Sequence, residues 1–147
     1  MSTMLSSHFS LEELTHSEIA VRKRINNTPD VDAGANLIEL AATLEQVREL
    51  LDCPLNISSG YRSPKVNATV GGADTSAHCR GYAVDFTARQ FGSPQEVCEK
   101  IRDSRIAFDQ LIYEGTWIHL SIDPRMRGQI LTAHFGGGKP TYTQGIG

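Results

Sequence analysis

Apolar residues recur at helical spacing in one long stretch of the first half of the chain. From about Ala33 to Leu51 they return every three or four positions, and the charged residues stand off that stripe. This spacing predicts an amphipathic helix with one buried face. The apolar positions are Leu37, Leu40, Leu44, Val47 and Leu51. We expect this helix to be the scaffold on which the rest of the domain packs.

Shorter helices are predicted from the residues that begin them. A Ser-x-x-Glu pattern starts at Ser10 and again at Ser93, and in this pattern the serine and the glutamate each satisfy a free backbone amide of a first helical turn. Ser63 followed by Pro64 predicts another short helix, because serine caps helices and proline fits the first helical position. The segment 26–30, with two asparagines and a proline, predicts a break before the long helix.

Five stretches have the composition of strands, and two of them are separated by only a few residues, which predicts a hairpin. The stretches are 56–59, 82–87, 108–113, 117–122 and 129–135. Helices and strands do not alternate regularly enough for a doubly wound parallel sheet. We therefore expect an α+β fold with a small antiparallel sheet and helices packed on one side. Residues 1–135 are expected to form a single domain, and the glycine-rich segment 136–147 a flexible tail.

The overall composition is that of a globular protein, and it excludes some classes of partner. The chain has 147 residues, a formal net charge of −3 and no basic run, which argues against a nucleic-acid or anionic-membrane partner. The three cysteines are odd in number and lack CxxC spacing, so we expect free thiols in a reducing compartment. We expect a monomer.

Two histidines and one aspartate lie in or just before apolar strands, where a polar side chain needs a bonding partner. His78 lies in a glycine-flanked polar loop that leads into an apolar strand holding Asp85, and His119 lies inside a second apolar strand. A buried carboxylate is costly unless it is paired, protonated or bound to a cation. Three protein ligands that leave a fourth position for water are typical of a catalytic zinc site. The pattern therefore predicts that His78, Asp85 and His119 bind Zn²⁺.

The predicted hairpin supplies a candidate general base. If Gly115 and Thr116 form a two-residue turn, Glu114 lies opposite Trp117, and side chains two apart on a strand share a face. Glu114 would then point to the same side as His119, near the metal without binding it. A carboxylate in that place can take a proton from a water acidified by zinc and pass it to a leaving amine.

Two further residues are candidates for substrate contact. Arg62 follows a short strand, and beside a hydrolytic metal site its guanidinium suits a substrate carboxylate or a developing oxyanion. Ser76, two residues before His78, is a candidate donor to the same substrate.

Together these motifs resemble the zinc D-alanyl-D-alanine carboxypeptidase family. The resemblance rests on Ser59-Gly60-Tyr61-Arg62, on Ser76-x-His78-x-x-Gly81-x-Ala83-x-Asp85 and on Trp117-x-His119, and it spans about residues 9–131. The family includes L-alanyl-D-glutamate endopeptidases, many of them phage endolysins, and shares its metal-site architecture with the hedgehog signalling domain.

The resemblance implies zinc ligation by His78, Asp85 and His119, with Arg62 and Ser76 near the scissile bond of a peptidoglycan stem peptide. In the better-known branches the base stands two or three residues before the second histidine ligand, whereas here these positions hold Trp117 and Thr116. Glu114, five residues before, resembles the pattern of compact phage and prophage members.

Three functions remain open from the sequence. The first is a zinc peptidase of stem peptides, acting either as a carboxypeptidase on terminal D-Ala or as an endopeptidase between L-Ala and D-Glu. The second is a non-catalytic metal-binding module for wall recognition or virion structure, which the missing base at the usual positions favours. The third is a D,D-dipeptidase that acts on free D-Ala-D-Ala.

The expected location follows from the family and from the polar N-terminal segment. Residues 1–8 have neither the charged nor the apolar region of a signal peptide, and no apolar run reaches membrane-spanning length. We therefore expect a phage or prophage lysis enzyme that is cytoplasmic at synthesis and reaches the wall through a permeabilised membrane.

Overall fold

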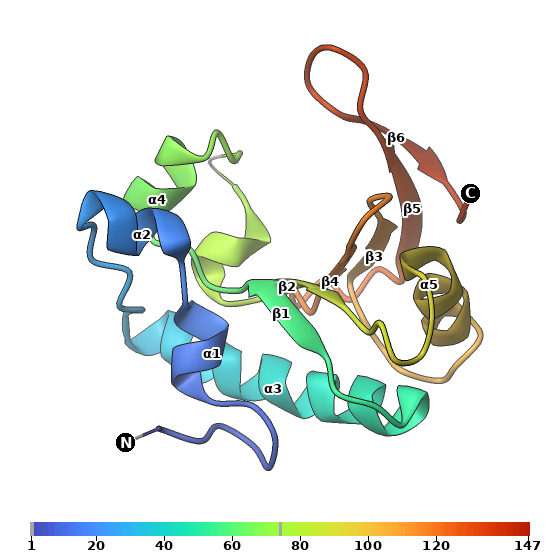
Figure 1. Ribbon diagram of the computed structural model, residues 1–147, viewed down its shortest axis with the longest axis horizontal. Helices are drawn as coiled ribbons and strands as arrows, with labels where there is room; N and C mark the ends of the chain where they lie inside the picture. Colours follow the sequence, from blue (N-terminus) through green and yellow to red (C-terminus); the bar gives the residue numbers. More distant parts are fainter. Residues whose placement is uncertain (1, 74) are drawn as a thin grey trace.

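The computed structural model describes residues 2–73 and 75–147, and it contains one six-stranded sheet with helices around it (Figure 1). The strands are β1 (Asn56–Ser59), β2 (Ala83–Thr87), β3 (Gln110–Tyr113), β4 (Ile118–Ser121), β5 (Gln129–His134) and β6 (Thr141–Gln144). The helices are α1 (Leu11–Thr15), α2 (Glu18–Lys23), α3 (Val31–Leu51), α4 (Pro64–Thr69) and α5 (Pro94–Arg102), with a 3₁₀ helix η1 at Ala77–Arg80. The predicted α+β class is confirmed.

The strand order across the sheet is β1-β2-β4-β3-β5-β6, and this order corrects one feature of the predicted sheet. The pairs β1·β2, β2·β4, β3·β4 and β5·β6 are antiparallel, but β3 and β5 are parallel. The sheet is therefore mixed and not wholly antiparallel. The parallel pair needs no helical crossover. Strand β4 returns the chain to the side of the sheet where β3 starts, and the loop 122–128 then passes the start of β3 to enter β5.

An ion pair with a buried carboxylate fixes that loop at the start of β3. The Arg127 guanidinium donates to both carboxylate oxygens of Asp109, at 2.9 and 2.8 Å, and the Arg127 backbone amide donates to the same carboxylate at 2.9 Å. Asp109 is 1% exposed. Its pKa is lowered chiefly by the hydrogen bond from the Arg127 side chain. The pair thus holds the start of β5 beside the start of β3.

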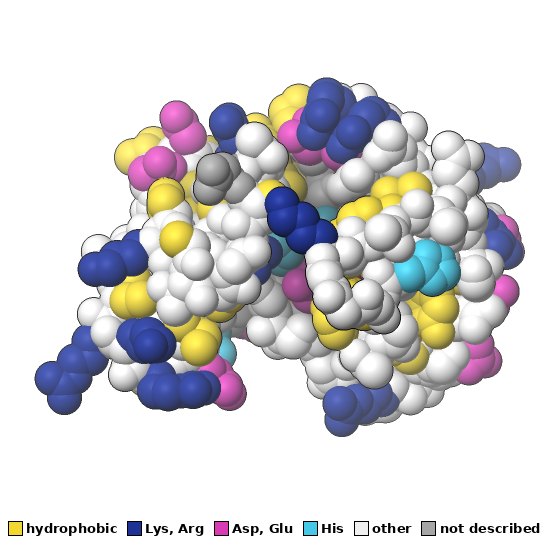
Figure 2. All heavy atoms as spheres, turned by 90° about the horizontal axis from the view of Figure 1, so that it is seen from above, with side chains coloured by type: hydrophobic (Ala, Val, Ile, Leu, Met, Phe, Trp, Pro, Cys, Tyr) yellow, Lys and Arg dark blue, Asp and Glu magenta, His cyan; other side chains and the backbone are white. Residues whose placement is uncertain are grey.

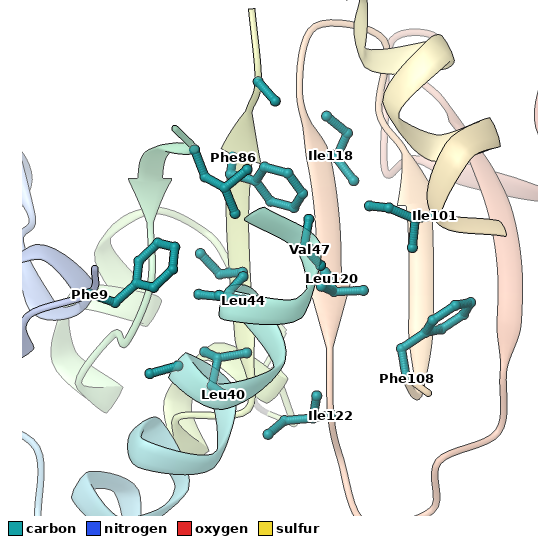
Figure 3. Packing of buried hydrophobic residues seen from close by; sticks show 14 of the residues in the cluster. Phe9, Leu40, Leu44, Val47, Phe86, Ile101, Phe108, Ile118, Leu120 and Ile122 are labelled. Carbon is teal, nitrogen blue, oxygen red and sulfur yellow. The ribbon is translucent and has the colours of Figure 1, made fainter. Parts of the chain in front are cut away.

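The hydrophobic core lies between one face of the sheet and the helices α3 and α5 (Figure 3). The predicted long helix is present, and it begins at Val31 because Asp30 caps it by accepting from the Ala33 amide at 2.8 Å. All five apolar positions of its predicted stripe are buried. On the sheet side the core residues include Phe86 of β2 and Leu120 of β4.

The opposite face of the central strands is open. Side chains alternate between the two faces of a strand, so the residues between core positions on β2 and β4 point away from α3. These residues are Asp85 and His119, which are paired directly across β2 and β4. The fold therefore places two of the predicted ligands on neighbouring strands by the same alternation that builds the core.

The C-terminal segment 136–147 differs from the expected tail. Thr141–Gln144 form β6, which pairs with β5 from Leu131↔Gln144 to His134↔Thr141. The glycine-rich stretch before it is the turn of a hairpin. Glycine and proline content predicted a chain without regular structure, whereas the alternating Thr-Tyr-Thr after Pro140 is suited to a strand.

The N-terminal region forms two short helices, α1 and α2. Ser10 caps α1 as predicted, with the Glu13 amide donating to its hydroxyl at 3.0 Å, and Ser17 caps α2 in the same way through the Ala20 amide at 3.1 Å. In the described parts of the chain, none of the helices has both the length and the apolar character required to cross a membrane.

Candidate metal centre

The three predicted ligands lie together on the open face of the sheet. Asp85 Oδ1 is 3.0 Å from His119 Nδ1 and 3.4 Å from His78 Nε2. One ligand atom from each residue lies within 4.8 Å of the others. Asp85 and His119 come from β2 and β4, and His78 comes from η1, which immediately precedes β2. The predicted ligands His78 and His119 are 41 residues apart in the chain, and the pairing of β2 with β4 brings the segments that carry them together.

The ring of His78 is held by the backbone beside β1. His78 is 3% exposed, and its Nδ1 is 2.7 Å from the carbonyl oxygen of Gly60. Because a carbonyl only accepts, Nδ1 carries the proton and Nε2 is left with its lone pair toward Asp85. This is the arrangement in which an outer hydrogen bond orients a metal-binding histidine.

Gly60 is required at that position by close packing. A Cβ atom added there would lie 2.2 Å from the carbonyl oxygen of Leu14 at the end of α1. The neighbouring Tyr61 amide donates to the same Leu14 carbonyl at 2.8 Å. Helix α1 therefore fixes the backbone segment that orients His78.

The electrostatics of the cluster favour the protonation states that bind metal. Burial lowers the pKa of His78, and this outweighs the nearby carboxylate, so the ring is neutral at neutral pH. Burial by itself would raise the pKa of Asp85, but the two imidazoles outweigh it and hold that pKa well below its usual range. Metal ligation requires neutral imidazole and ionised carboxylate.

The donor set and its spacing suit a tetrahedral cation. Zinc bonds of about 2.0–2.2 Å in a tetrahedron place ligand atoms about 3.3 Å from one another. The two distances from Asp85, 3.0 and 3.4 Å, lie on either side of that value. Two imidazole nitrogens and one carboxylate oxygen are ligands that zinc accepts, and three protein ligands leave a position for water.

Glu114 lies on the same face as His119, at the end of the hairpin. The Glu114 amide donates to the Trp117 carbonyl at 3.1 Å, and Tyr113 pairs with Ile118, so Gly115 and Thr116 form the two-residue turn. Burial raises the pKa of Glu114 most, and the charge of Asp85 raises it further. A carboxylate with a raised pKa beside a metal cluster is suited to exchanging a proton near neutral pH.

The Glu114 side chain is oriented by an indole that sequence reasoning did not assign to it. Trp117 Nε1 donates to Glu114 Oε2 at 2.9 Å, and the Trp117 ring packs against Phe135 with centroids 6.0 Å apart. The hairpin geometry put both side chains on one face, but only the three-dimensional structure shows the hydrogen bond. One carboxylate oxygen is thereby held, and the other is left for solvent or substrate.

Arg62 and Ser76 lie together on the opposite side of the cluster. Arg62 Nη2 is 3.5 Å from Ser76 Oγ, and the Arg62 amide donates to the His78 carbonyl at 3.1 Å. Within the described residues, Arg62 Nε is a buried donor without a hydrogen-bond partner. The Ser76 hydroxyl also accepts from the His78 amide at 3.3 Å, as the cap of η1. Arg62 thus has donors for a ligand, whereas Ser76 has a local structural role.

A cleft of ≈ 530 Å³ opens beside the cluster and runs between β1 and α2. Its lining includes Asp85, Arg62 and Tyr61 at one end and Glu18 and Arg22 of α2 at the other. Figure 2, which looks onto this side, shows the surface hollowed between two lobes, with histidine and acidic side chains in the hollow. Of the three predicted ligands, Asp85 lines this cleft.

Comparison with known proteins identifies the family. The family model for peptidase M15 matches residues 7–121. The chain belongs to the peptidase M15 family. The match contains the three clustered ligands, Arg62 and Glu114, and it confirms the resemblance inferred from the motifs. As an M15 member the chain is a metallopeptidase. No curated protein sequence gives a match to it.

Proposed function

We propose that this M15 peptidase hydrolyses a peptide bond in peptidoglycan stem peptides, with zinc bound by His78, Asp85 and His119. The observation that carries the proposal is the convergence of three metal-type donors and a carboxylate of raised pKa, Glu114, on one open face. A bound zinc ion would supply an acidified water and polarise the scissile carbonyl. The remaining steps fall to side chains of the chain itself.

Glu114 is the proposed general base and acid. Its free carboxylate oxygen accepts the proton of the attacking water, and the protonated carboxyl then donates that proton to the nitrogen of the leaving amine. Desolvation keeps its pKa above the ordinary value, which helps it to hold the proton between the two transfers. Trp117 keeps the side chain in one orientation through the 2.9 Å hydrogen bond.

Arg62 is the proposed donor to the scissile carbonyl oxygen. Its unpaired buried Nε and its guanidinium charge suit an oxygen that becomes negative in the transition state. Ser76 is proposed to hold the Arg62 side chain and to line the peptide site next to it. The peptide would then lie across the cluster with Arg62 on one side and Glu114 on the other.

The substrate class is supported by the resemblance of the motifs to those of peptidases that cut peptidoglycan stem peptides. Both the D-Ala-D-Ala carboxypeptidase and the L-Ala-D-Glu endopeptidase reactions fit these residues. Mass spectrometry of defined muropeptides after incubation with the zinc-loaded protein distinguishes them, since one reaction releases D-Ala and the other releases the L-Ala fragment.

The decisive test of the chemistry is Glu114→Gln, with Glu39→Gln on the exposed face of α3 as the matched control. We expect Glu114→Gln to retain one equivalent of zinc and to lose stem-peptide hydrolysis by about 10²-fold or more, the usual range for a general base. The control should keep both properties. Zinc binding without hydrolysis by the wild-type protein would instead indicate the non-catalytic wall-recognition or virion module.

We further propose that the protein is a monomeric phage or prophage lysis enzyme that acts on the wall after the membrane is permeabilised. Expression together with a membrane-permeabilising protein should lyse cells, and expression of either protein alone should not. Lysis that persists with Glu114→Gln would contradict a role for the peptidase activity. Hydrolysis confined to free D-Ala-D-Ala would favour the dipeptidase function.

A further inference from the structure

The C-terminal strand places a tyrosine on the same face of the sheet as the metal cluster. Tyr142 of β6 pairs with Ala133 of β5. Along β5, Ala133 is two residues from Leu131, which pairs with Ile112, and Ile112 pairs with His119. Paired residues and residues two apart share a face, so Tyr142 projects on the His119 side.

Tyr142 also lies in the same row across the sheet as Glu114. The parallel pair Tyr113↔Thr132 continues to Glu114 beside Ala133, and Ala133 is paired with Tyr142. Two strand spacings of about 4.8 Å separate the backbones of Glu114 and Tyr142. The residue between them is an alanine, so only a methyl group stands between the two longer side chains.

Exposure and electrostatics are consistent with a Tyr142 side chain close to this row. Ala133 is 8% exposed although it stands on the open face, which requires neighbouring side chains to cover it. Tyr142 itself is 49% exposed. The pKa of its phenol is raised by burial first, and then by the negative charges of Glu114 and Asp85. The phenol therefore keeps its proton at neutral pH and can donate a hydrogen bond.

We propose that Tyr142 is a further active-site residue, whose phenolic hydroxyl donates a hydrogen bond to the bound peptide on the Glu114 side of the cluster, opposite Arg62. This inference rests on the proposed function and adds a contact to it. Tyr142 lies beyond the segment 7–121 that the family model matches, so the contact belongs to this chain's own C-terminal hairpin. This hairpin, β5 and β6, continues the sheet beyond β3 (Figure 1).

The test is Tyr142→Phe, which removes the hydroxyl and keeps the ring, with Thr143→Val as the control on the neighbouring residue of the same strand. Thr143 projects to the other side, where its hydroxyl is 2.8 Å from His134 Nε2. The assay uses the zinc-loaded full chain and a synthetic stem pentapeptide that ends in D-Ala-D-Ala, or a peptide with the L-Ala-D-Glu bond if that bond is the one cut. We expect Tyr142→Phe to lower kcat/KM about tenfold. Zinc content and thermal unfolding should not change.

The pH profile gives a readout that a structural role would not move. In the wild-type protein, kcat/KM should fall at alkaline pH as the phenol ionises, and Tyr142→Phe should lose this limb. An unchanged kcat/KM in Tyr142→Phe, within twofold of wild type, overturns the proposal.

A second measurement separates this inference from the proposed function. In metal-free protein labelled with ¹³Cζ-tyrosine, NMR titration should show the Tyr142 pKa falling in Glu114→Gln, because a nearby negative charge is removed. If the wild-type protein hydrolyses no stem peptide but this shift is present, the proposed function fails and the Tyr142–Glu114 proximity stands. If the shift is absent, the inference fails whatever the activity.

Discussion

The two faces of β2 and β4 are made from alternating residues of the same strands, yet they have opposite chemistry. On one face Val84, Phe86 and Leu120 are fully buried against α3 and α5. On the other, Asp85 and His119 lie 3.0 Å apart beside His78. A shift of one residue in strand register would exchange the two sets. The packed face thus fixes the register on which the reactive face depends.

The packed face determines how the strands sit in the fold, whereas the proposed chemistry lies on the other face. The packed face contributes the apolar burial that stabilises the domain. The reactive face brings a carboxylate and two imidazoles into a poorly hydrated place, which lowers stability unless a cation or another partner compensates. Substitutions on the two faces should therefore separate activity from stability.

The largest effect is expected on the reactive face. His119→Ala removes one of the three proposed ligands. We expect it to abolish stoichiometric zinc binding and to lower hydrolysis by about 10³-fold or more, since both the acidified water and the polarised carbonyl would be lost. The metal-free unfolding free energy should change by only about 1 kcal/mol. Metal analysis, hydrolysis assays and denaturant titration measure the three quantities. His134→Ala, an exposed histidine on β5, is the control, and an equal loss there would contradict the ligand assignment.

The packed face should show the reverse pattern. Phe86→Ala removes a fully buried ring, and we expect the unfolding free energy to fall by about 3–5 kcal/mol, from lost burial and the cavity left behind. At a temperature where the variant remains folded, its zinc stoichiometry should match the wild-type value. Loss of zinc from a folded Phe86→Ala protein would show that the two faces are not separable.

Asp109 sharpens the comparison. Its carboxylate is buried, but unlike that of Asp85 it is paired with an arginine of the same chain, Arg127. Asp109→Ala removes the bidentate contact with Arg127 and should lower the unfolding free energy by about 2–3 kcal/mol. Asp123 makes the same three contacts with Arg125, but that arginine is 63% exposed, and Asp123→Ala should cost about 0.5 kcal/mol or less.

The stability contributed by the Asp109–Arg127 pair depends on pH in a defined direction. The folded-state pKa of Asp109 is lowered, so its stabilising contribution is complete above the unfolded pKa of about 3.9 and is lost as pH falls through the folded pKa. The difference in unfolding free energy between wild type and Asp109→Ala should therefore be largest near neutral pH and shrink below about pH 4. Denaturant titrations at several pH values measure it, and a difference that grows on acidification would refute the assignment.

A small effect is expected at the exposed start of α5. Ser93 accepts from the Glu96 amide at 3.2 Å, and Glu96 accepts from the Ser93 amide at 3.0 Å. Ser93→Ala should lower the unfolding free energy by about 1 kcal/mol and leave kcat/KM unchanged. A thermal unfolding curve with a parallel activity assay checks both, and a loss of activity would mean that α5 supports the site more directly.

The features that sequence predicted well are those with a local cause. The capping serines, the apolar stripe of α3 and the two-residue turn after Glu114 each depend on neighbouring residues. The cluster of His78, Asp85 and His119 was predictable because polar side chains inside apolar strands need a partner.

The features that sequence missed depend on distant pairing. The parallel alignment of β3 with β5 follows from the order of strands across the sheet, and no local pattern encodes it. The Gly60 carbonyl that orients His78 is a backbone group with no side-chain signature. Strand β6 was not predicted, because the glycine and proline residues before it favoured a flexible tail. The position of Tyr142 on the sheet could therefore not be predicted either.

Trp117 gives the molecule a built-in optical probe. It is the only tryptophan in the chain, and its indole donates to Glu114 while its ring packs against Phe135. Intrinsic tryptophan emission therefore reports on the environment of the candidate base alone, without background from the rest of the protein. Metal loading, peptide docking and movement of the C-terminal hairpin can each be followed in the unlabelled protein through this one signal.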